Sequence, residues 1–364
     1  MTRDWLDPLL VPPVRELPSN AAYLAHLALT AEDATLIRLA SNESTEPPSP
    51  RVRDALAQAY LEANLSAPPV PPLRSALAVR HGVGSERVLL GAGSTELIDA
   101  VFRTVAGPGD EVVLPTPSWP VYRRRLQVLG ASIVEIPLAR GERAWRYDVD
   151  ALLEAITSHT KLLVLCSPNN PTGNSLPLAA VRRCAEAAPL LLLDAAYADF
   201  DEEADLSPLV HESERVVLMR TFSKAYCLAG LRVGYCVGAG AVIDRLDRVL
   251  VPGSSVASAS LQAALAALED EGYHRRQVER VRAERERVAD GLRELGVRAY
   301  DSRGNFVAVE VGDAGAFAAA LRARRIVVRV HDDRLVRITV GRPQENDALL
   351  AAVRDTLPLS GRRA

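Results

Sequence analysis

The chain has 364 residues, of which 48% are hydrophobic and 24% are charged, and its formal net charge is −3. These values are typical of a globular protein that is long enough for one large and one smaller domain. The charge gives no electrostatic footprint for nucleic acid, and no apolar run approaches the length of a membrane span. We therefore expect neither a nucleic-acid partner nor a membrane anchor.

Residues 1–38 contain helix-like pieces that are broken by Pro12, Pro13 and Pro18. We expect an N-terminal arm there rather than an independent domain. The first residues carry acids where a secretory signal would be basic and then apolar, and the four cysteines lack metal-ligand spacing. These features predict a cytoplasmic protein with reduced cysteines and no metal site.

Short apolar runs alternate with helical patterns between residues 87 and 237. Several of the runs are apolar on both faces, as in strands that helices cover on each side. The alternation predicts an α/β domain with a mostly parallel, seven-stranded sheet. We expect strands at Arg87–Leu90, Glu111–Leu114, Ser132–Ile136, Lys161–Cys166, Leu190–Asp194, Val216–Arg220 and Val233–Val237, and helices at Thr95–Val105, Pro120–Leu129, Leu178–Ala187 and near 204–212.

The composition changes after residue 255. Residues 256–294 are rich in Ala, Leu, Arg and Glu without proline, which predicts long helices. Short strands are expected after them at Phe306–Val311, Val327–Val330 and Leu335–Val340, with a helix at Ala314–Arg324. We therefore predict a large domain at 39–250 and a smaller α+β domain at 251–364.

Lysine is almost absent from the chain. Among 43 lysines and arginines only Lys161 and Lys224 are lysines. An arginine stays protonated, whereas a lysine amine can be deprotonated by its surroundings and attack a carbonyl. Lys161 opens an apolar strand and is expected to be an ordinary surface residue. Lys224 is flanked by Ser223 and Arg232, a hydroxyl and a guanidinium suited to a phosphate. An amine beside a phosphate site predicts pyridoxal phosphate as the cofactor.

Three more polar groups follow predicted strands, where ligands gather in open α/β sheets. Ser94 and Thr95 begin a helix after a Gly-Ala-Gly turn and are suited to bind a phosphate, although an ordinary capped helix start fits as well. Asn170 lies in Ser-Pro-Asn-Asn-Pro-Thr-Gly, a segment that a simple turn also explains. Asp194 ends a very apolar strand three residues before Tyr197, and it is either a helix cap or a carboxylate with a buried partner.

These groups together resemble the fold-type-I pyridoxal-phosphate enzymes, within them the histidinol-phosphate-aminotransferase-like branch. The resemblance runs from about Leu39 to the C-terminus. Four ordered motifs carry it, and they read Ser-Pro-Asn-Asn-Pro-Thr-Gly (167–173), Arg-Thr-Phe-Ser-Lys (220–224), Gly-Leu-Arg-Val-Gly-Tyr (230–235) and Leu-Val-Arg-Ile-Thr-Val-Gly (335–341).

The resemblance implies a role for each cofactor residue. Lys224 would hold the cofactor as an imine and then serve as general base and acid. Asp194 would pair with the pyridinium nitrogen, and Asn170 and Tyr197 would hydrogen-bond the ring's phenolate oxygen. Trp119 matches an aromatic residue that stacks on the ring, although a lone tryptophan is more often a core residue.

The resemblance is less complete on the substrate side. Arg337 matches the arginine that binds the substrate α-carboxylate, and Arg329 matches one used at the substrate's far end. Glu46 stands where the family has a tyrosine, which would disfavour a substrate phosphate unless the carboxylate points to solvent. Leu65 replaces a tyrosine that reaches the neighbouring subunit's cofactor.

We therefore expect a homodimeric pyridoxal-phosphate aminotransferase that acts on an amino acid or amino alcohol and on a 2-oxo acid. An alternative keeps the cofactor but leads to decarboxylation, elimination or cyclisation of an amino acid, possibly a cationic one. A second alternative is a sensor that binds the cofactor without turnover, which the absence of a DNA-binding extension disfavours. The same first contacts serve all of these outcomes.

Overall fold

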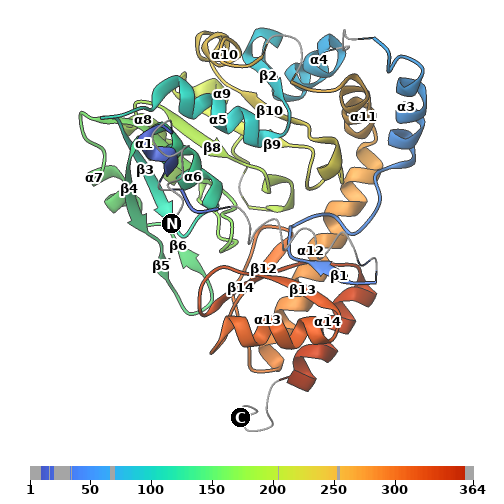
Figure 1. The fold of residues 1–364 in the computed structure, drawn as a ribbon. Helices are drawn as coiled ribbons and strands as arrows, with labels where there is room; N and C mark the ends of the chain where they lie inside the picture. Colours follow the sequence, from blue (N-terminus) through green and yellow to red (C-terminus); the bar gives the residue numbers. More distant parts are fainter. Residues whose placement is uncertain are drawn as a thin grey trace, which may run out of the picture.

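A computed structural model shows two β-sheets stacked one above the other along the molecule (Figure 1). The upper unit holds a seven-stranded sheet between two layers of helices, and the lower unit holds a five-stranded sheet. The structure describes residues 10–15, 17–19, 33, 35–65, 70–203, 205–251 and 255–356.

The large sheet has the strand order β2-β10-β9-β8-β7-β3-β4. All its neighbours are parallel except β10, which is antiparallel to both β2 and β9. All seven strands predicted between residues 87 and 237 are present, with ends that differ by one or two residues. They are β2 (Val88–Gly91), β3 (Glu111–Thr116), β4 (Ser132–Pro137), β7 (Thr160–Cys166), β8 (Leu191–Asp194), β9 (Val216–Thr221) and β10 (Gly234–Val237).

Helices cover both faces of this sheet, which explains why its strands are apolar on both sides. One face packs against α5 (Ser94–Val105), α6 (Pro120–Leu129) and α10 (Gly240–Asp247). The other packs against α4 (Val70–His81), α8 (Leu178–Ala187) and α11 (Ser258–Glu269). Alternate strand residues enter the two cores: Leu192 lies in the first and Leu193 in the second.

The smaller sheet combines the two ends of the chain. Its order is β1-β13-β14-β12-β11, and β1 (Ile37–Leu39) lies parallel to β13 at one edge. One face of the sheet packs on α12 (Glu271–Glu294), α13 (Ala314–Ala323) and α14 (Pro343–Thr356). The predicted C-terminal strands correspond to β12 (Phe306–Glu310), β13 (Ile326–Val330) and β14 (Leu335–Thr339), with the two-residue β11 (Arg298–Ala299) at the far edge.

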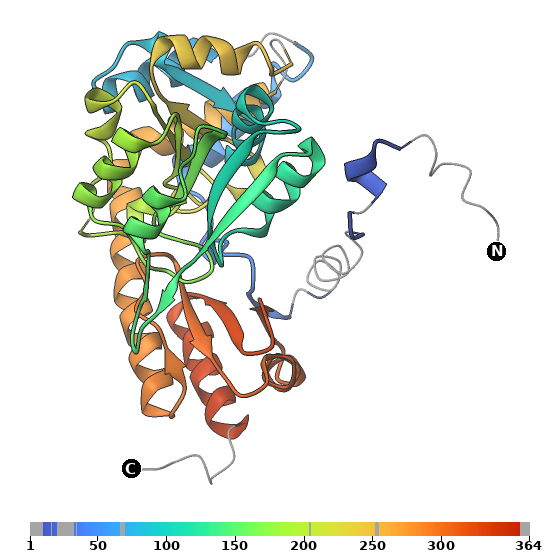
Figure 2. The same ribbon diagram turned by 90° about the vertical axis from the view of Figure 1, so that its left-hand side faces the viewer.

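A hairpin of the large unit reaches down beside the small sheet (Figures 1 and 2). Its strands are β5 (Ala139–Arg140) and β6 (Trp145–Arg146). Trp145 packs with Tyr300 and Leu335 of the small sheet, and Arg140 forms an ion pair with Glu310 at 3.3 Å. These contacts join the two units on the side opposite to α12.

The contacts of β1 and α11 indicate where the chain passes from one unit to the other. β1 belongs to the small sheet, whereas α11 packs against α3 (Pro50–Tyr60) and α4 of the large unit. We propose that the chain passes between the units at about residue 40 and again along α12, in place of the boundaries at 39 and 251 predicted above.

Several helices carry no clear sequence signal. α3 begins at Pro50, and α4 has two prolines in its first turn, where the missing N–H groups would have no helical partner anyway. The helix expected near 204–212 shortens to α9 (Leu209–Glu212), and α1 (Pro12–Arg15) is the helix described in the arm.

Among the described residues no helix has the length and apolarity to cross a bilayer.

Candidate active site

The candidate residues meet at one edge of the large sheet. The parallel strands β3, β7, β8 and β9 all end at this edge, as does β2, so the segments that follow them are neighbours. The segment after β9 bears Lys224, β8 itself ends with Asp194, and the segment after β7 bears Asn170. Sequence reasoning placed all three at strand ends, and the sheet order makes them adjacent.

Lys224 extends from the loop after β9 toward the small unit. Its Nζ donates to the backbone oxygen of Ser41 at 3.2 Å and lies 5.8 Å from the centre of the Tyr197 ring. Burial and the positive charge of Arg337 lower the pKa of Lys224 to about 8, although the nearby Glu43 carboxylate opposes the shift. The amine is therefore much more easily deprotonated than that of an exposed lysine, as a nucleophile or base requires.

Asp194 is buried at the end of β8 and carries two hydrogen bonds. The Tyr122 hydroxyl donates to its Oδ2 at 2.5 Å, and the Ala196 N–H donates to its Oδ1 at 3.0 Å. Burial raises the pKa of Asp194, while these bonds and the charge of Lys224 partly offset the rise. A buried carboxylate that burial penalises in this way is stabilised further by a cationic partner.

The Tyr197 hydroxyl lies between two amides. Asn42 Nδ2 donates to it at 3.1 Å and Asn170 Nδ2 at 3.3 Å. Burial raises the pKa of Tyr197 to about 12, so the phenol keeps its proton. Because the oxygen already accepts two hydrogen bonds, the O–H itself is available to donate to a ligand.

Arg337 lies within β14 and links the two units. Its Nη1 donates to Asn170 Oδ1 at 2.6 Å, and its Nη2 donates to the Ala40 backbone oxygen at 2.5 Å. The guanidinium also lies 5.6 Å from the centre of the Phe306 ring. A guanidinium held in this fixed orientation, beside the lysine, is suited to bind a carboxylate through two hydrogen bonds.

A second cationic region lies at the start of α5. Gly93 has a φ of 80°, and a Cβ there would lie 2.5 Å from Arg232 Nη2, so the guanidinium covers this turn closely. A Cβ on Gly234 would meet the Ser94 backbone nitrogen at 2.3 Å. The two glycines thus let β10 and Arg232 approach the helix start that bears Ser94 and Thr95. A helix N-terminus beside a guanidinium forms a site for an anion such as phosphate.

Trp119 and Ser223 complete the set predicted for the cofactor. Trp119 precedes α6 and packs edge-on against Tyr122, with ring centres 5.4 Å apart. Because Tyr122 also hydrogen-bonds Asp194, Trp119 contacts the residue that holds Asp194 in place. Ser223 is buried next to Lys224, and its N–H donates to Thr221 Oγ1 at 3.1 Å.

The residues predicted on the substrate side are more dispersed. Arg329 lies opposite Arg337 in the β13–β14 pair. Glu46 is half-buried, and its charge acts on Cys227, Tyr273 and Arg342 near α12. Leu65 is 60% exposed. Lys161, the other lysine, is exposed and lies 3.9 Å from Asp110 on the opposite edge of the sheet, as an ordinary surface residue would.

Three residues near the site were missed by sequence reasoning. Tyr122, three positions after Trp119, holds Asp194, and its place in the first turn of α6 was the available signal. Asn42 binds Tyr197 and also accepts from Thr339 Oγ1 at 3.1 Å. Glu43, unlike Glu46, is an acid whose charge acts on Lys224. Asn42 and Glu43 approach the site only because β1 joins the small sheet, which the sequence did not indicate.

The residues present fit pyridoxal phosphate. The buried Asp194 calls for a cation such as a pyridinium nitrogen, the Gly93–Arg232 turn suits a phosphate, and Lys224 has the lowered pKa that attack on an aldehyde needs. A mixed seven-stranded sheet with these groups at its carboxyl edge defines a pyridoxal-phosphate-dependent enzyme of fold type I.

Comparison with known proteins identifies the family. Residues 34–353 match the family described as aminotransferase class I and II, and the chain belongs to it. It is 40% identical over 330 residues to an aromatic amino acid aminotransferase from Rhodococcus jostii, covering 88% of this chain and 90% of that protein. It is 39% identical over 378 residues to histidinol-phosphate aminotransferase 2 from Caulobacter vibrioides, covering 99% and 98%.

A solved structure agrees with these relatives. Histidinol-phosphate aminotransferase from Sinorhizobium meliloti in complex with pyridoxal 5′-phosphate superimposes with a TM-score of 0.86 at 28% identity, covering 95% of this chain and 97% of that one. The protein is a pyridoxal-phosphate-dependent aminotransferase that acts on amino acids, as the sequence predicted.

Proposed function

We propose that Lys224 is the residue that binds pyridoxal phosphate covalently, and that Asp194 pairs with the ring nitrogen. One observation supports this proposal most strongly: a lysine with a pKa of about 8, a buried carboxylate and an anion site at Gly93 meet at one sheet edge. Ser94, Thr95, Ser223 and Arg232 would hold the phosphate at that anion site. Trp119 would stack on the ring, and Asn170 and Tyr197 would hydrogen-bond its phenolate oxygen.

In this proposal the chain's own residues bind, orient and move protons. Bound pyridoxal phosphate supplies an aldehyde and an electron-withdrawing ring, which together make the α-proton of an amino acid acidic. Lys224 Nζ takes that proton from the α-carbon, and its low pKa keeps a useful fraction of the amine neutral. Asp194, fixed by Tyr122, keeps a positive charge on its partner nitrogen favourable.

Arg337 would bind the α-carboxylate of the amino acid and of the 2-oxo acid. The guanidinium is fixed by Asn170 and Ala40 before any substrate arrives, so little rotamer entropy is lost on binding. The same arginine serves both half-reactions, because donor and acceptor share the carboxylate next to the reacting carbon.

We propose that the amino donor carries a neutral aromatic or imidazole side chain. Support comes from the aromatic amino acid aminotransferase at 40% identity and from Glu46, which replaces a tyrosine of the histidinol-phosphate branch. A carboxylate near the far end of the substrate would repel a phosphate dianion and would not repel a phenyl, phenol or imidazole ring.

A screen of amino donors tests this function. Single-turnover spectra should show conversion of the bound aldehyde to the amine form with phenylalanine, tyrosine or histidine, followed by its reversal with a 2-oxo acid. A strong preference for histidinol phosphate would instead return the chain to the default of its branch. Loss of CO2 or ammonia in place of transfer would favour the decarboxylase or eliminase alternative.

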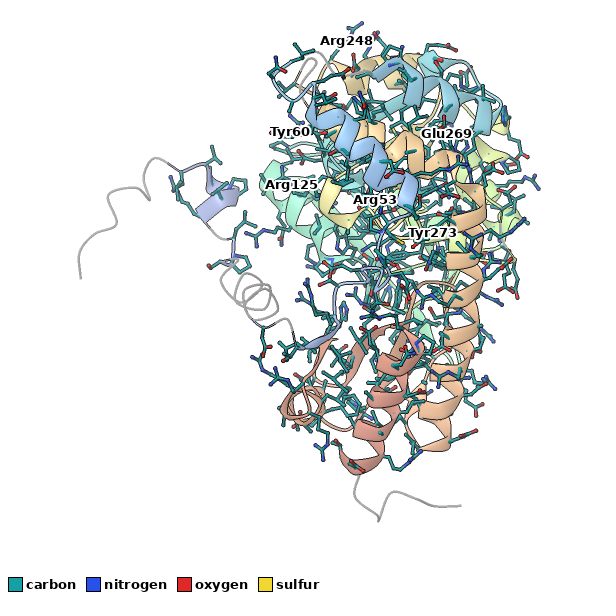
Figure 3. The ribbon with its side chains drawn as sticks, turned by 90° about the vertical axis from the view of Figure 1, so that its right-hand side faces the viewer. Arg53, Tyr60, Arg125, Arg248, Glu269 and Tyr273 are labelled. Carbon is teal, nitrogen blue, oxygen red and sulfur yellow. The ribbon has the colours of Figure 1, made fainter. Side chains whose placement is uncertain are left out.

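We also infer that two copies of the chain associate. Tyr60 at the end of α3, and Leu61 and Leu65 just after it, are 78%, 68% and 60% exposed. Figure 3 shows Tyr60 at the outer end of α3. Large apolar side chains grouped in this way favour a protein interface, and a two-fold axis lets the same surface serve both copies.

We also propose a cytoplasmic location, which the four free cysteines support.

Sedimentation equilibrium of the cofactor-loaded protein tests the dimer. Leu61→Glu should shift the mass toward a monomer because it buries a charge in the interface. Arg275→Glu, on the exposed face of α12, is the matched control and should leave the mass unchanged. A monomeric wild type, or a dimer that Leu61→Glu does not weaken, would contradict the proposal.

A further inference from the structure

His331 lies on the β13–β14 hairpin close to Arg337. Its backbone N–H donates to Leu335 O at 2.9 Å, two positions beyond the Arg329–Arg337 pair of the same ladder, with the Val330–Val336 pair between them. Residues opposite each other in antiparallel strands share a face, and every second residue along a strand shares it too. The register therefore puts Arg329, His331, Leu335 and Arg337 on one face of the small sheet.

This face looks toward the large unit and the candidate active site. Arg337 reaches Asn170 from it, and Leu335 packs from it against Leu138 and Trp145 of the large unit. The opposite face bears Val336 and Ile338, which belong to the core with α12, α13 and α14. His331 is thus next to the proposed carboxylate site, on the side toward the β5–β6 hairpin, which Figure 1 shows beside the small sheet.

The imidazole of His331 is neutral and has an unused nitrogen. Burial, together with the positive charges of Arg337 and Arg329, lowers the pKa of His331 to about 3. Its Nε2 is buried and has no hydrogen-bond partner within the part of the chain that the structure describes. A buried nitrogen without a partner is unfavourable, and it gains when a ligand supplies the missing hydrogen bond.

We propose that His331 Nε2 hydrogen-bonds the polar end of the substrate's side chain, so that the enzyme prefers ring-bearing amino acids with such a group over phenylalanine. The inference rests on the proposed function, in which Arg337 holds the α-carboxylate. A phenol hydroxyl both donates and accepts, so it pairs with either tautomer of a neutral imidazole, and an imidazole ring offers one nitrogen of each kind. A phenyl ring offers neither and leaves Nε2 without a partner.

The first test compares kcat/KM for tyrosine and phenylalanine. His331→Phe should lower the tyrosine-to-phenylalanine ratio about fivefold, because one hydrogen bond of about 1 kcal/mol is lost for tyrosine only. His331→Gln retains a donor and an acceptor and should preserve most of the ratio. Asp333→Asn, exposed in the same turn, is the matched control and should leave the ratio unchanged. An active His331→Phe enzyme with the wild-type ratio would overturn the proposal.

A second measurement needs neither turnover nor a variant. The holoenzyme is titrated with 3-(4-hydroxyphenyl)propionate and with 3-phenylpropionate, and the imidazole nitrogens of His331 are followed by 15N NMR. Only the hydroxylated acid should move the Nε2 resonance. Equal shifts with both acids would overturn the role of His331 while leaving the aminotransferase intact, whereas a wild type inactive with every aromatic amino acid would refute the proposed function instead.

Discussion

The edge of the large sheet and the β13–β14 hairpin contribute to the candidate site in different ways. At the sheet edge each polar residue lies at a strand end or shortly after it: Asp194 is the last residue of β8, and Lys224 follows β9. On the hairpin, Arg329 and Arg337 lie inside strands and His331 lies in the turn. The first region bears the residues that we propose hold the cofactor, and the second bears the residues that we propose contact the substrate.

The largest effect is expected at Lys224. Lys224→Ala should abolish covalent attachment of the cofactor and lower kcat by about 10³-fold or more, because both nucleophile and base are removed. Borohydride reduction and peptide mapping of the wild type should place the cofactor on Lys224. Lys161→Ala, on the exposed side chain that faces Asp110, is the control and should behave as wild type. Label on Lys161 would refute the assignment.

Asp194→Asn should be the next most damaging change. A neutral amide cannot stabilise a protonated ring nitrogen, so we expect a loss of about 3 kcal/mol in the barrier, or about 10²-fold in kcat, with cofactor still bound. Tyr122→Phe removes only the 2.5 Å hydrogen bond to Asp194 and should cost less, about tenfold. Near-normal turnover by Asp194→Asn would show that the carboxylate only caps the turn at Ala196.

The pKa of Lys224 predicts a pH dependence. In the cofactor-free protein the rate of pyridoxal-phosphate attachment should rise with pH and level off above about 8, since the pKa of Lys224 is lowered from 10.5 to about 8. The shift also opposes folding below pH 8, and that cost disappears as the pH rises toward 10.5, because the unfolded chain binds the extra proton in this window. A rate midpoint near 10.5 would contradict the burial of the amine.

The smallest effect concerns Glu46. If its carboxylate disfavours a phosphate at the far end of the substrate, Glu46→Gln should raise kcat/KM for histidinol phosphate relative to neutral and basic amino acids by about tenfold or less. Efficiencies for histidinol phosphate, phenylalanine and arginine decide this. Unchanged ratios would mean that Glu46, whose charge acts on Tyr273 and Arg342 near α12, does not face the substrate.

How well the sequence predicted each region follows from how the region is built. The seven strands and the residues at their ends could be predicted, because apolar runs and the polar residues that end them are neighbours in the sequence. Asn42 and Glu43 could not, because they reach Tyr197 and Lys224 through the pairing of β1 with β13, which leaves no local pattern. The place of His331 beside Arg337 could not be predicted either, because it depends on the register of β13 and β14 and on which face of the small sheet looks toward the large unit.

The position of β1 affects the order in which parts of the protein fold during synthesis. Asn42 N–H donates to Thr339 Oγ1, and Arg337 Nη2 donates to Ala40 O, each pair 297 positions apart along the chain. During synthesis the strands of the large sheet emerge well before β13 and β14 do, and domains generally fold as they emerge. The loop that carries Asn42 must therefore wait, without its final partners, until almost the whole polypeptide has left the ribosome. The proposed carboxylate site at Arg337 is therefore expected to form last in the nascent chain.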